Sequence, residues 1–425
     1  MKGRNTRTYL FTKIKEYTVS SDDTVKSTAN LSITDGLFWS IYSSLTVPFV
    51  IPLSIFLLGK NAPVGYITGF PVLIVPLSQF LSRYFSSKSK DLKKLTIYTT
   101  LIDRILWVPV VFLIFVHGYV LTYALLILLL SIRTFFASFS GTTWTLWVPG
   151  VIPAQNRSGY FAFRNFVMKI FSLVGYALAL GIFLRIGNEE IAFILVFLLG
   201  ALAFSSISLL VMSRIHSYSI PDSEKAINHN KLPYRFRNLV IYSIIWGIGY
   251  SMILPYFQLY LISSKYLGLS ESFYTIIYIT ISISFIASQI LWGKLAARFG
   301  NFIIVAINSA AIIISAVLIP SIRSSSLIFV PAVLYGVGQS GITLSLFNEM
   351  LSRSDSSRIN SVSIYNMAQS ISMGIGPIFA NFLIDAFNVN IEFVFEISTA
   401  FMALSIVYFI VGDLISRKNV RAKVL

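Results

Sequence analysis

Residues 190–213 read EIAFILVFLLGALAFSSISLLVMS and carry no charged side chain after Glu190. A helix that crosses the ~30 Å hydrocarbon layer of a membrane needs about 20 predominantly apolar residues. The next residues, 214–238, read RIHSYSIPDSEKAINHNKLPYRFRN, contain two prolines and many charges, and hold no apolar run. The abrupt change after residue 213 predicts a membrane-spanning helix followed by a polar linker.

Apolar runs of similar length recur on both sides of this linker. Six precede it and six follow it, at 34–58, 63–84, 95–116, 119–148, 161–184, 190–213, 239–264, 271–296, 299–320, 324–350, 358–385 and 393–415. Of the 425 residues, 56% are hydrophobic and 12% are charged, which is roughly half the charge of an ordinary soluble domain. A spanning β-barrel would instead show alternating segments of about 10 residues. The sequence therefore predicts an all-α integral membrane protein with twelve transmembrane helices.

The runs divide the chain into five parts. We expect a cytoplasmic amino-terminal tail at 1–33, a six-helix bundle at 34–213, a cytoplasmic linker at 214–238, a second six-helix bundle at 239–415 and a cytoplasmic tail at 416–425. The first 30 residues are polar and basic and lack the apolar core of a signal peptide. They are therefore expected to remain on the mature protein.

The basic residues indicate how the spans are oriented, because Lys and Arg stay on the cytoplasmic side in short loops. With both termini inside, 27 of the 33 basic residues fall on the inner side and two lie within the layer. The outer side then holds four, namely Lys60, Arg185, Lys265 and Arg323. We therefore expect a multi-pass protein of the cell (cytoplasmic) membrane with both termini in the cytoplasm.

The composition argues against several function classes. The chain has no cysteine, and its three histidines lack the spacing of metal ligands, so neither a metal centre nor another cofactor is expected. No nucleophile-elbow serine and no phosphate-binding Gly-Lys loop is present, which disfavours hydrolase chemistry and an ATP-driven pump. The net charge of +16 is spread over the inner segments without an aromatic-interleaved patch. It fits membrane topology and contact with anionic lipid, and no nucleic-acid partner is expected.

The two halves share short sequence patterns at equivalent places. The end of the second run, Leu77-Ser-Gln-Phe-Leu-Ser-Arg-Tyr84, aligns with Trp292-Gly-Lys-Leu-Ala-Ala-Arg-Phe299 at the end of the eighth. Arg157 is followed eight residues later by Asn165 at the start of the fifth run, and Arg358 is followed likewise by Asn366 at the start of the eleventh. These matches predict two pseudo-symmetric six-helix bundles.

With these patterns the chain resembles the major facilitator superfamily of secondary transporters. That family carries Gly-x-x-x-Asp-Arg-x-Gly-Arg-Arg between helices 2 and 3 and an echo between helices 8 and 9. Here residues 293–300 keep Gly293, Arg298 and Gly300, with Ala297 in place of the Asp, and the first half keeps only Arg83. The resemblance implies two bundles that rock around a central site. It also implies an inner gate that includes Arg83, Arg157, Gly293, Arg298, Gly300 and Arg358.

The resemblance further implies that helices 1, 4, 7 and 10 surround the substrate cavity, with help from helices 5 and 11. Polar and aromatic residues on these helices suit a polar or amphipathic organic solute. The expected cavity residues are Trp39, Tyr42, Thr46, Arg133, Asn165, Trp246, Tyr250, Gln339, Asn366 and Gln369. Trp144 and Trp147 lie near the inner boundary and are expected to be interfacial anchors.

Few ionisable residues lie within the predicted membrane layer, and each is a functional hypothesis. Asp103 and Arg104 are adjacent in a helix, so their side chains diverge. Arg133 lies at a depth that allows pairing with Asp103, either as a proton-sensitive switch or as a lock, or else it attracts an anionic substrate. Asp35 is interpreted as an N-cap or as part of a gate, and Asp35 and Asp103 are the proton-coupling candidates. Glu349 is either an inner-gate ion pair or a solvated loop charge.

The favoured function is a monomeric secondary transporter of a small molecule, with protons as a second candidate partner and lipid around it. The direction of transport is open. Two alternatives remain: an integral-membrane enzyme acting on lipid, against which stands the lack of a His/Asp/Glu cluster at one interface, and a transporter-like receptor or scaffold, which the short loops disfavour.

Overall fold

The computed structural model of the chain describes residues 23–424 apart from 60, 90, 153, 218–232 and 354–357. Within these residues, twelve helical segments are long and apolar enough to cross a membrane. The twelve-helix, all-α fold predicted from the sequence is confirmed, and the protein is a multi-pass membrane protein.

The first six spans include several helices that are broken within the span. Their elements are α2 (Asp23–Thr46), η1 (Val47–Phe49), α3 (Val50–Leu58), α4 (Val64–Leu73), α5 (Val75–Lys88), α6 (Leu92–Ile105), α7 (Trp107–Phe112), η2 (Leu113–Phe115), α8 (Tyr119–Val151), α9 (Ala154–Arg185), α10 (Glu189–Leu198), a π-helical turn (Leu199–Phe204) and α11 (Ser205–Met212). Pro48 and Pro76 stand at the breaks in the first two spans, because proline has no amide hydrogen to continue the helical ladder.

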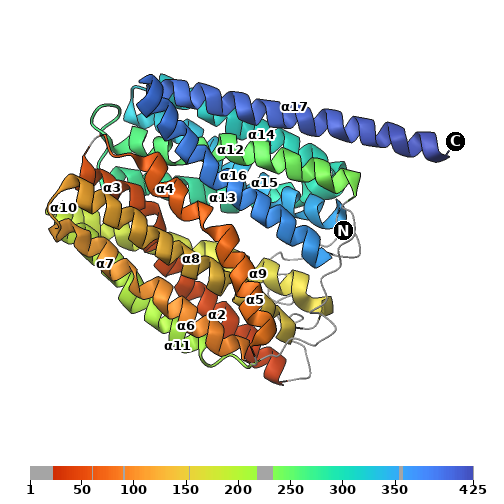
Figure 1. Cartoon of the computed structure of the whole chain (residues 1–425), viewed down its shortest axis with the longest axis horizontal. Coiled ribbons are helices and arrows are strands. Elements are labelled where there is room, and N and C mark those ends of the chain that lie inside the picture. The colour runs from red at the N-terminus through yellow and green to blue at the C-terminus, as the bar shows by residue number, and fades with distance from the viewer. Residues whose placement is uncertain are drawn as a thin grey trace, which may run out of the picture.

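The second six spans are mostly continuous. They are α12 (Tyr234–Ile262), α13 (Glu271–Phe299), α14 (Asn301–Leu318) with η5 (Ile319–Ser321), η6 (Ser325–Ile328) with α15 (Phe329–Arg353), α16 (Arg358–Phe387) and α17 (Ile391–Val424). Figure 1 shows α2 to α11 gathered in one group of helices and α12 to α17 in another. We call the end of the molecule where α11 stops and α12 starts the linker end, and the opposite end the far end.

The same helix pairs pack together in each half. α2 packs against α9 and α11, as α12 packs against α16 and α17, and α6 packs against α8 as α14 packs against α15. Between the halves, α4 contacts α16 and α9 contacts α13. This repeat of contacts agrees with the pseudo-symmetry expected from the sequence patterns.

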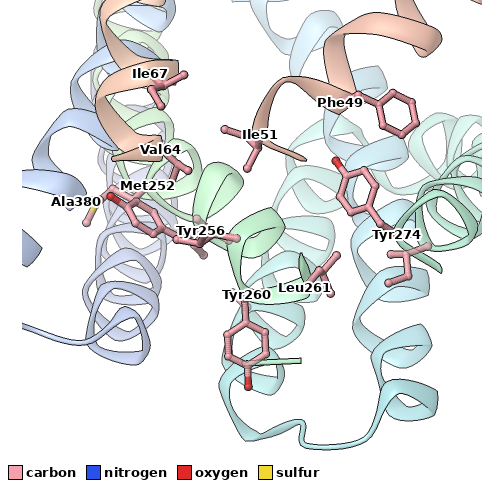
Figure 2. Packing of buried hydrophobic residues seen from close by; sticks show 14 of the residues in the cluster. Phe49, Ile51, Val64, Ile67, Met252, Tyr256, Tyr260, Leu261, Tyr274 and Ala380 are labelled. Atoms are coloured by element: carbon pink, nitrogen blue, oxygen red, sulfur yellow. The ribbon is translucent and has the colours of Figure 1, made fainter. Parts of the chain in front are cut away.

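The halves meet closely at the far end. The Gly65 amide donates a hydrogen bond to Asn381 Oδ1 at 3.1 Å, and the Tyr274 hydroxyl donates to the Pro48 carbonyl at 2.6 Å. Figure 2 shows the Tyr274 ring beside that of Phe49, and the ring centres are 6.0 Å apart. A side chain at position 65 would overlap the Pro377 carbonyl and lie 2.8 Å from Asn381 Cβ. Gly65 therefore permits the close packing of helices that small residues allow in membranes.

The first span begins well before residue 34, where the apolar run starts. α2 begins at Asp23, so part of the expected amino-terminal tail is helical, while residues 1–22 lie outside the described part of the chain. The predicted linker has a described portion on each side of residues 218–232, and the side chains after Leu414 are not described.

Candidate functional site

A cavity of about 330 Å³ lies among the first six spans. It is lined from α2, α6, α8, α9 and α11, and its lining runs from the middle of these spans to Met212 at the linker end. Its volume suits a small organic solute. Five charged residues line it, namely Asp35, Asp103, Arg104, Arg133 and Arg164.

The deepest charges form an ion pair between α8 and α6. Arg133 Nε lies 2.9 Å from Asp103 Oδ1, so the two residues pair, a point that the sequence left open. Despite this short distance, the two atoms do not meet the geometry of a hydrogen bond, and neither has another hydrogen-bond partner among the described residues. The Arg133 guanidinium also lies 4.4 Å from the centre of the Trp107 ring, a cation–π contact. The pair is held in place and yet leaves hydrogen-bonding capacity unused.

Tyr42 connects this pair to the first span. Its hydroxyl donates to Asp103 Oδ2 at 3.5 Å and accepts a hydrogen bond from Trp107 Nε1 at 2.7 Å. The ring of Tyr42 also lies under the Arg104 guanidinium, 5.4 Å from its centre. Tyr42 is therefore both a lining residue, as predicted, and a positioning residue for Asp103.

Asp35 lies inside the helix bundle, and its interpretation as an N-cap is wrong. α2 begins at Asp23, so Asp35 is in the helix interior, where it is 2% exposed. Its carboxylate accepts a 2.5 Å hydrogen bond from Ser208 Oγ and lies 3.9 Å from Arg164 Nη2. Arg164 Nε in turn donates to the Ser32 carbonyl. Asp35 therefore connects α2 with α9, through Arg164, and with α11, through Ser208.

Arg104 lies between these two groups and points away from its neighbour Asp103, as expected for adjacent helical residues. Its Nη1 donates to the Ser205 carbonyl at 2.6 Å, and its Nη2 donates to Ser208 Oγ at 3.1 Å. Because Ser205 directly follows the π-helical turn, the local widening of the helix occurs at the binding site of Arg104. The ionisable residues thus form one connected network.

The predicted cavity residues fall into three groups. Trp39, Tyr42 and Arg133 line the cavity, and Trp39 is 41% exposed. Thr46 does not line it, because the side chain is buried beside Gly200 and its hydroxyl donates to the Tyr42 carbonyl. The other six predicted residues, Asn165, Trp246, Tyr250, Gln339, Asn366 and Gln369, are also absent from its lining.

Three of these residues belong to an aromatic cluster in the second half. The rings of Trp246 and Tyr250 stack with centres 6.0 Å apart, and the Tyr250 hydroxyl is hydrogen-bonded to Tyr335 and, at 3.2 Å, to Gln339 Oε1. Asn165 and Asn366 are exposed, and Gln369 is half-buried. The residues on the two halves therefore do not form a single closed pocket in this conformation.

The predicted gate residues have more varied settings. Gly300 ends α13 with φ at 87°, a left-handed conformation that favours glycine. Arg298 is exposed with its guanidinium 5.1 Å from the Phe299 ring centre, Arg83 is exposed, and Gly293 faces Leu344. The side chains of Arg157 and Arg358 lie outside the described part of the structure.

Glu349 is in an ion pair. Arg353 Nε lies 2.6 Å from Glu349 Oε2, and Arg353 Nη2 lies 3.2 Å from Asp413 Oδ1, so α15 is tied to α17 near the linker end. Arg235 Nη2, at the start of α12, lies 3.6 Å from Asp413 Oδ1. This network lies within the second half, and the interpretation of Glu349 as a solvated charge is wrong.

Sequence reasoning missed Arg164 and Lys169, which it counted only as inner-side charges. Both lie within the fifth apolar run, and that position was the available signal. Arg164 lies 4.4 Å from the ring centre of Trp144. Trp144 lines the cavity, and Trp147 is fully buried and donates to the His216 carbonyl at 2.7 Å. The prediction that these tryptophans are interfacial anchors is therefore wrong.

Two six-span halves with a cavity lined by charged side chains within the spans are the architecture of an integral-membrane transporter. The sequence matches the family model described as Major Facilitator Superfamily over residues 36–363. The chain belongs to this superfamily, which points to a secondary transporter rather than an enzyme. No curated protein matches the chain in sequence.

Solved structures with the same fold are transporters of different solutes. A mutant of the nucleoside transporter NupG has a TM-score of 0.68 at 14% identity, and the match covers 91% of this chain and 99% of that one. A bacterial homologue of the iron transporter ferroportin, in an inward-facing state, has a TM-score of 0.67 at 15% identity, covering 92% and 99%. A bacterial metal transporter has a TM-score of 0.63 at 14% identity, covering 93% and 99%. At these identities the similarity shows the fold alone.

Proposed function

We propose that the protein is a secondary active transporter that moves a small organic solute across the cytoplasmic membrane by alternating access. The observation that carries this proposal is the asymmetry between the two ends. The halves are hydrogen-bonded to each other at the far end, through Gly65 with Asn381 and Tyr274 with Pro48. The polar cavity lies on the side of the linker end.

The orientation of the basic residues supports a cytoplasmic location of the linker end and of both termini. By the positive-inside rule, the end that carries most Lys and Arg faces the cytoplasm. The conformation then has its cavity on the cytoplasmic side and its extracellular side closed. Transport requires the reverse conformation as well, in which the far-end contacts separate and the linker ends of the halves approach each other.

The buried carboxylates supply a route for proton coupling, and Asp103 is the better candidate. Asp35 receives a short hydrogen bond from Ser208 and lies beside Arg164, whereas Asp103 Oδ1 has no hydrogen-bond partner among the described residues although it lines the cavity. A proton on Asp103 would weaken its attraction to Arg133 and leave that guanidinium available to a solute.

Reconstitution separates this proposal from the two alternatives. Purified protein in liposomes should accumulate or exchange at least one compound from a radiolabelled mixture of organic acids, amines, sugars and nucleosides, and the compound should remain chemically unchanged. Chemical conversion of a lipid or solute without flux would establish an enzyme. Neither flux nor conversion would favour a receptor or scaffold.

A further inference from the structure

The ionisable groups that line the cavity carry unequal charge. Three guanidinium groups, from Arg104, Arg133 and Arg164, face two carboxylates, from Asp35 and Asp103, which leaves one positive charge. A guanidinium does not lose its proton in proteins, so the imbalance persists even when both carboxylates are ionised. Uncompensated charge among membrane spans is costly, and a bound anion would neutralise it.

Arg133 is the guanidinium placed to bind that anion. Arg104 is 1% exposed and donates to Ser205 and Ser208, and Arg164 donates to the Ser32 carbonyl. The side chain of Arg133 is the most exposed of the three, at 15% against 9% for Arg164. The buried Nε–H has no acceptor among the described residues in Arg133, as also in Arg104. A planar guanidinium with free donors matches a carboxylate in a two-point hydrogen bond.

Lys169 adds a second positive charge near the interface of the halves. Its ammonium lies 4.6 Å from the ring centre of Phe285 on α13, and the side chain is exposed. It lies two helical turns from Tyr176, whose ring packs against Tyr278 of the same helix α13, so both residues lie on the face of α9 that meets the second half. This charge would draw anions towards the cavity.

The facing half provides no charge at this depth. Residues 239–262, 274–293 and 324–348 contain no Asp, Glu, Lys or Arg. Trp39 and Trp144 line the cavity, and on the second half the buried Trp246 is stacked on Tyr250. A solute that fits both halves has one charged end and an apolar or aromatic body.

We infer that the solute is an organic monoanion, with an acidic group that binds Arg133 and an apolar body that contacts the aromatic side chains. The inference rests on the proposed transport function and narrows it. It separates this chain from metal carriers of the same fold, because among the described residues no three His, Cys, Asp or Glu side chains are grouped to hold a metal ion. The net positive charge of the cavity also repels cations.

Thermal stability with matched probes tests this inference. The probes are 3-phenylpropionate, its amide, the corresponding 3-phenylpropylammonium, phenethyl phosphate and phenylsuccinate, together with the straight-chain carboxylates from acetate to decanoate. At about one hundredfold above Kd, a monocarboxylate should raise the Tm of the wild type by about 3 °C or more. The amide and the ammonium compound, which share its skeleton, should not.

The variants identify the binding group. Arg133→Gln should abolish the Tm shift caused by the monocarboxylate. If this single variant does not fold, the double variant Arg133→Gln/Asp103→Asn replaces it, because it leaves no buried carboxylate unpaired. The double variant should also lose the Tm shift. Arg185→Gln, at an exposed arginine near the far end, should keep the shift. Asp103→Asn leaves two net positive charges, so phenylsuccinate or phenethyl phosphate should gain at least tenfold in affinity relative to 3-phenylpropionate.

The inference is overturned if no monocarboxylate shifts the Tm, if the amide or ammonium probe shifts it as much, or if the shift survives removal of the Arg133 guanidinium. An ammonium or amide that binds and is transported would refute the substrate class while leaving the transport function intact. A protein that binds a monocarboxylate but moves no solute would refute the transport function alone.

Discussion

Arg133 on α8 and Asp103 on α6 form an ion pair in which Nε and Oδ1 are 2.9 Å apart without the geometry of a hydrogen bond. A charge pair among membrane spans is held mainly by the cost of leaving either partner alone. Its geometry permits exchange of the carboxylate partner, because the donors of Arg133 are only partly used.

A double-mutant cycle on Arg133 and Asp103 should show that the two residues stabilise each other. Arg133→Gln or Asp103→Asn alone should lower the free energy of unfolding by about 3–5 kcal/mol, because each leaves one buried charge without its partner. The double variant should lose less than the sum of the two. Denaturation in detergent measures the effect, and strictly additive losses would show that the two residues do not interact.

Asp103 should also determine how flux depends on pH. In liposomes, wild-type uptake should rise with an imposed proton gradient, and Asp103→Asn should remove that dependence because an amide cannot carry the proton. Asp91→Asn is the matched control, since Asp91 caps the linker end of α6 and pairs with Lys94 there, outside the cavity lining. Retention of the gradient dependence in Asp103→Asn would exclude Asp103 as the proton carrier.

Ser208 is hydrogen-bonded to both Asp35 and Arg104, so removing its hydroxyl should lower the stability of the protein markedly. Ser208→Ala removes a donor to Asp35 Oδ1 and an acceptor for Arg104 Nη2, and it should destabilise the protein by about 1–3 kcal/mol. Ser213→Ala, at an exposed serine just after α11, should change stability by less than about 0.5 kcal/mol. Equal effects at the two serines would show that the network contributes nothing to stability.

The far-end packing makes two glycines respond in opposite ways to the same substitution. Gly65→Ala places a methyl group against the Pro377 carbonyl of the other half, so the thermal midpoint should fall. Gly181→Ala has open space around it and should be stabilising by up to about 1 kcal/mol through helix propensity. A Gly65→Ala protein as stable as the wild type would mean that the halves are not in close contact there.

The sequence predicted the number of spans well, because apolar length is a local property. It misplaced Asp35, since the helical residues from Asp23 onward leave no apolar signal. It placed Asp103 and Arg133 at depths that allow them to pair, but whether they do was decided only by the structure. The partners of Asp35 could not be predicted from the sequence, because Ser208 and Arg164 lie on other helices whose rotation depends on tertiary packing.

The direction in which a side chain faces was the least predictable feature. Helical spacing placed Trp39, Tyr42 and Thr46 together, yet Thr46 is turned towards Gly200 and is buried. Trp144 and Trp147 have the composition of interfacial anchors, but one lines the cavity and the other is buried against the chain after α11. Which neighbour covers a given helix face is a property of the assembled bundle.

The central claim is that opening one end of the protein closes the other, and cysteine labelling at both ends tests it most directly. The chain has no cysteine of its own, so each introduced thiol is the only one labelled. Val64→Cys places a thiol at a fully buried far-end position, labelled in Figure 2, and Ala137→Cys places one in the cavity. The labelling is done in detergent, where a bulky maleimide reaches both ends of the protein. Each thiol is labelled in three backgrounds: otherwise wild type, Asn381→Ala, and the control Asn61→Ala at an exposed far-end position.

Asn381→Ala removes the acceptor of the Gly65 amide and of the Tyr256 hydroxyl, which should cost the closed far end about 1–3 kcal/mol. Alternating access predicts faster labelling of the thiol in Val64→Cys and slower labelling of the thiol in Ala137→Cys, with Asn61→Ala without effect. Both thiols becoming more reactive together, or neither changing, would contradict the account.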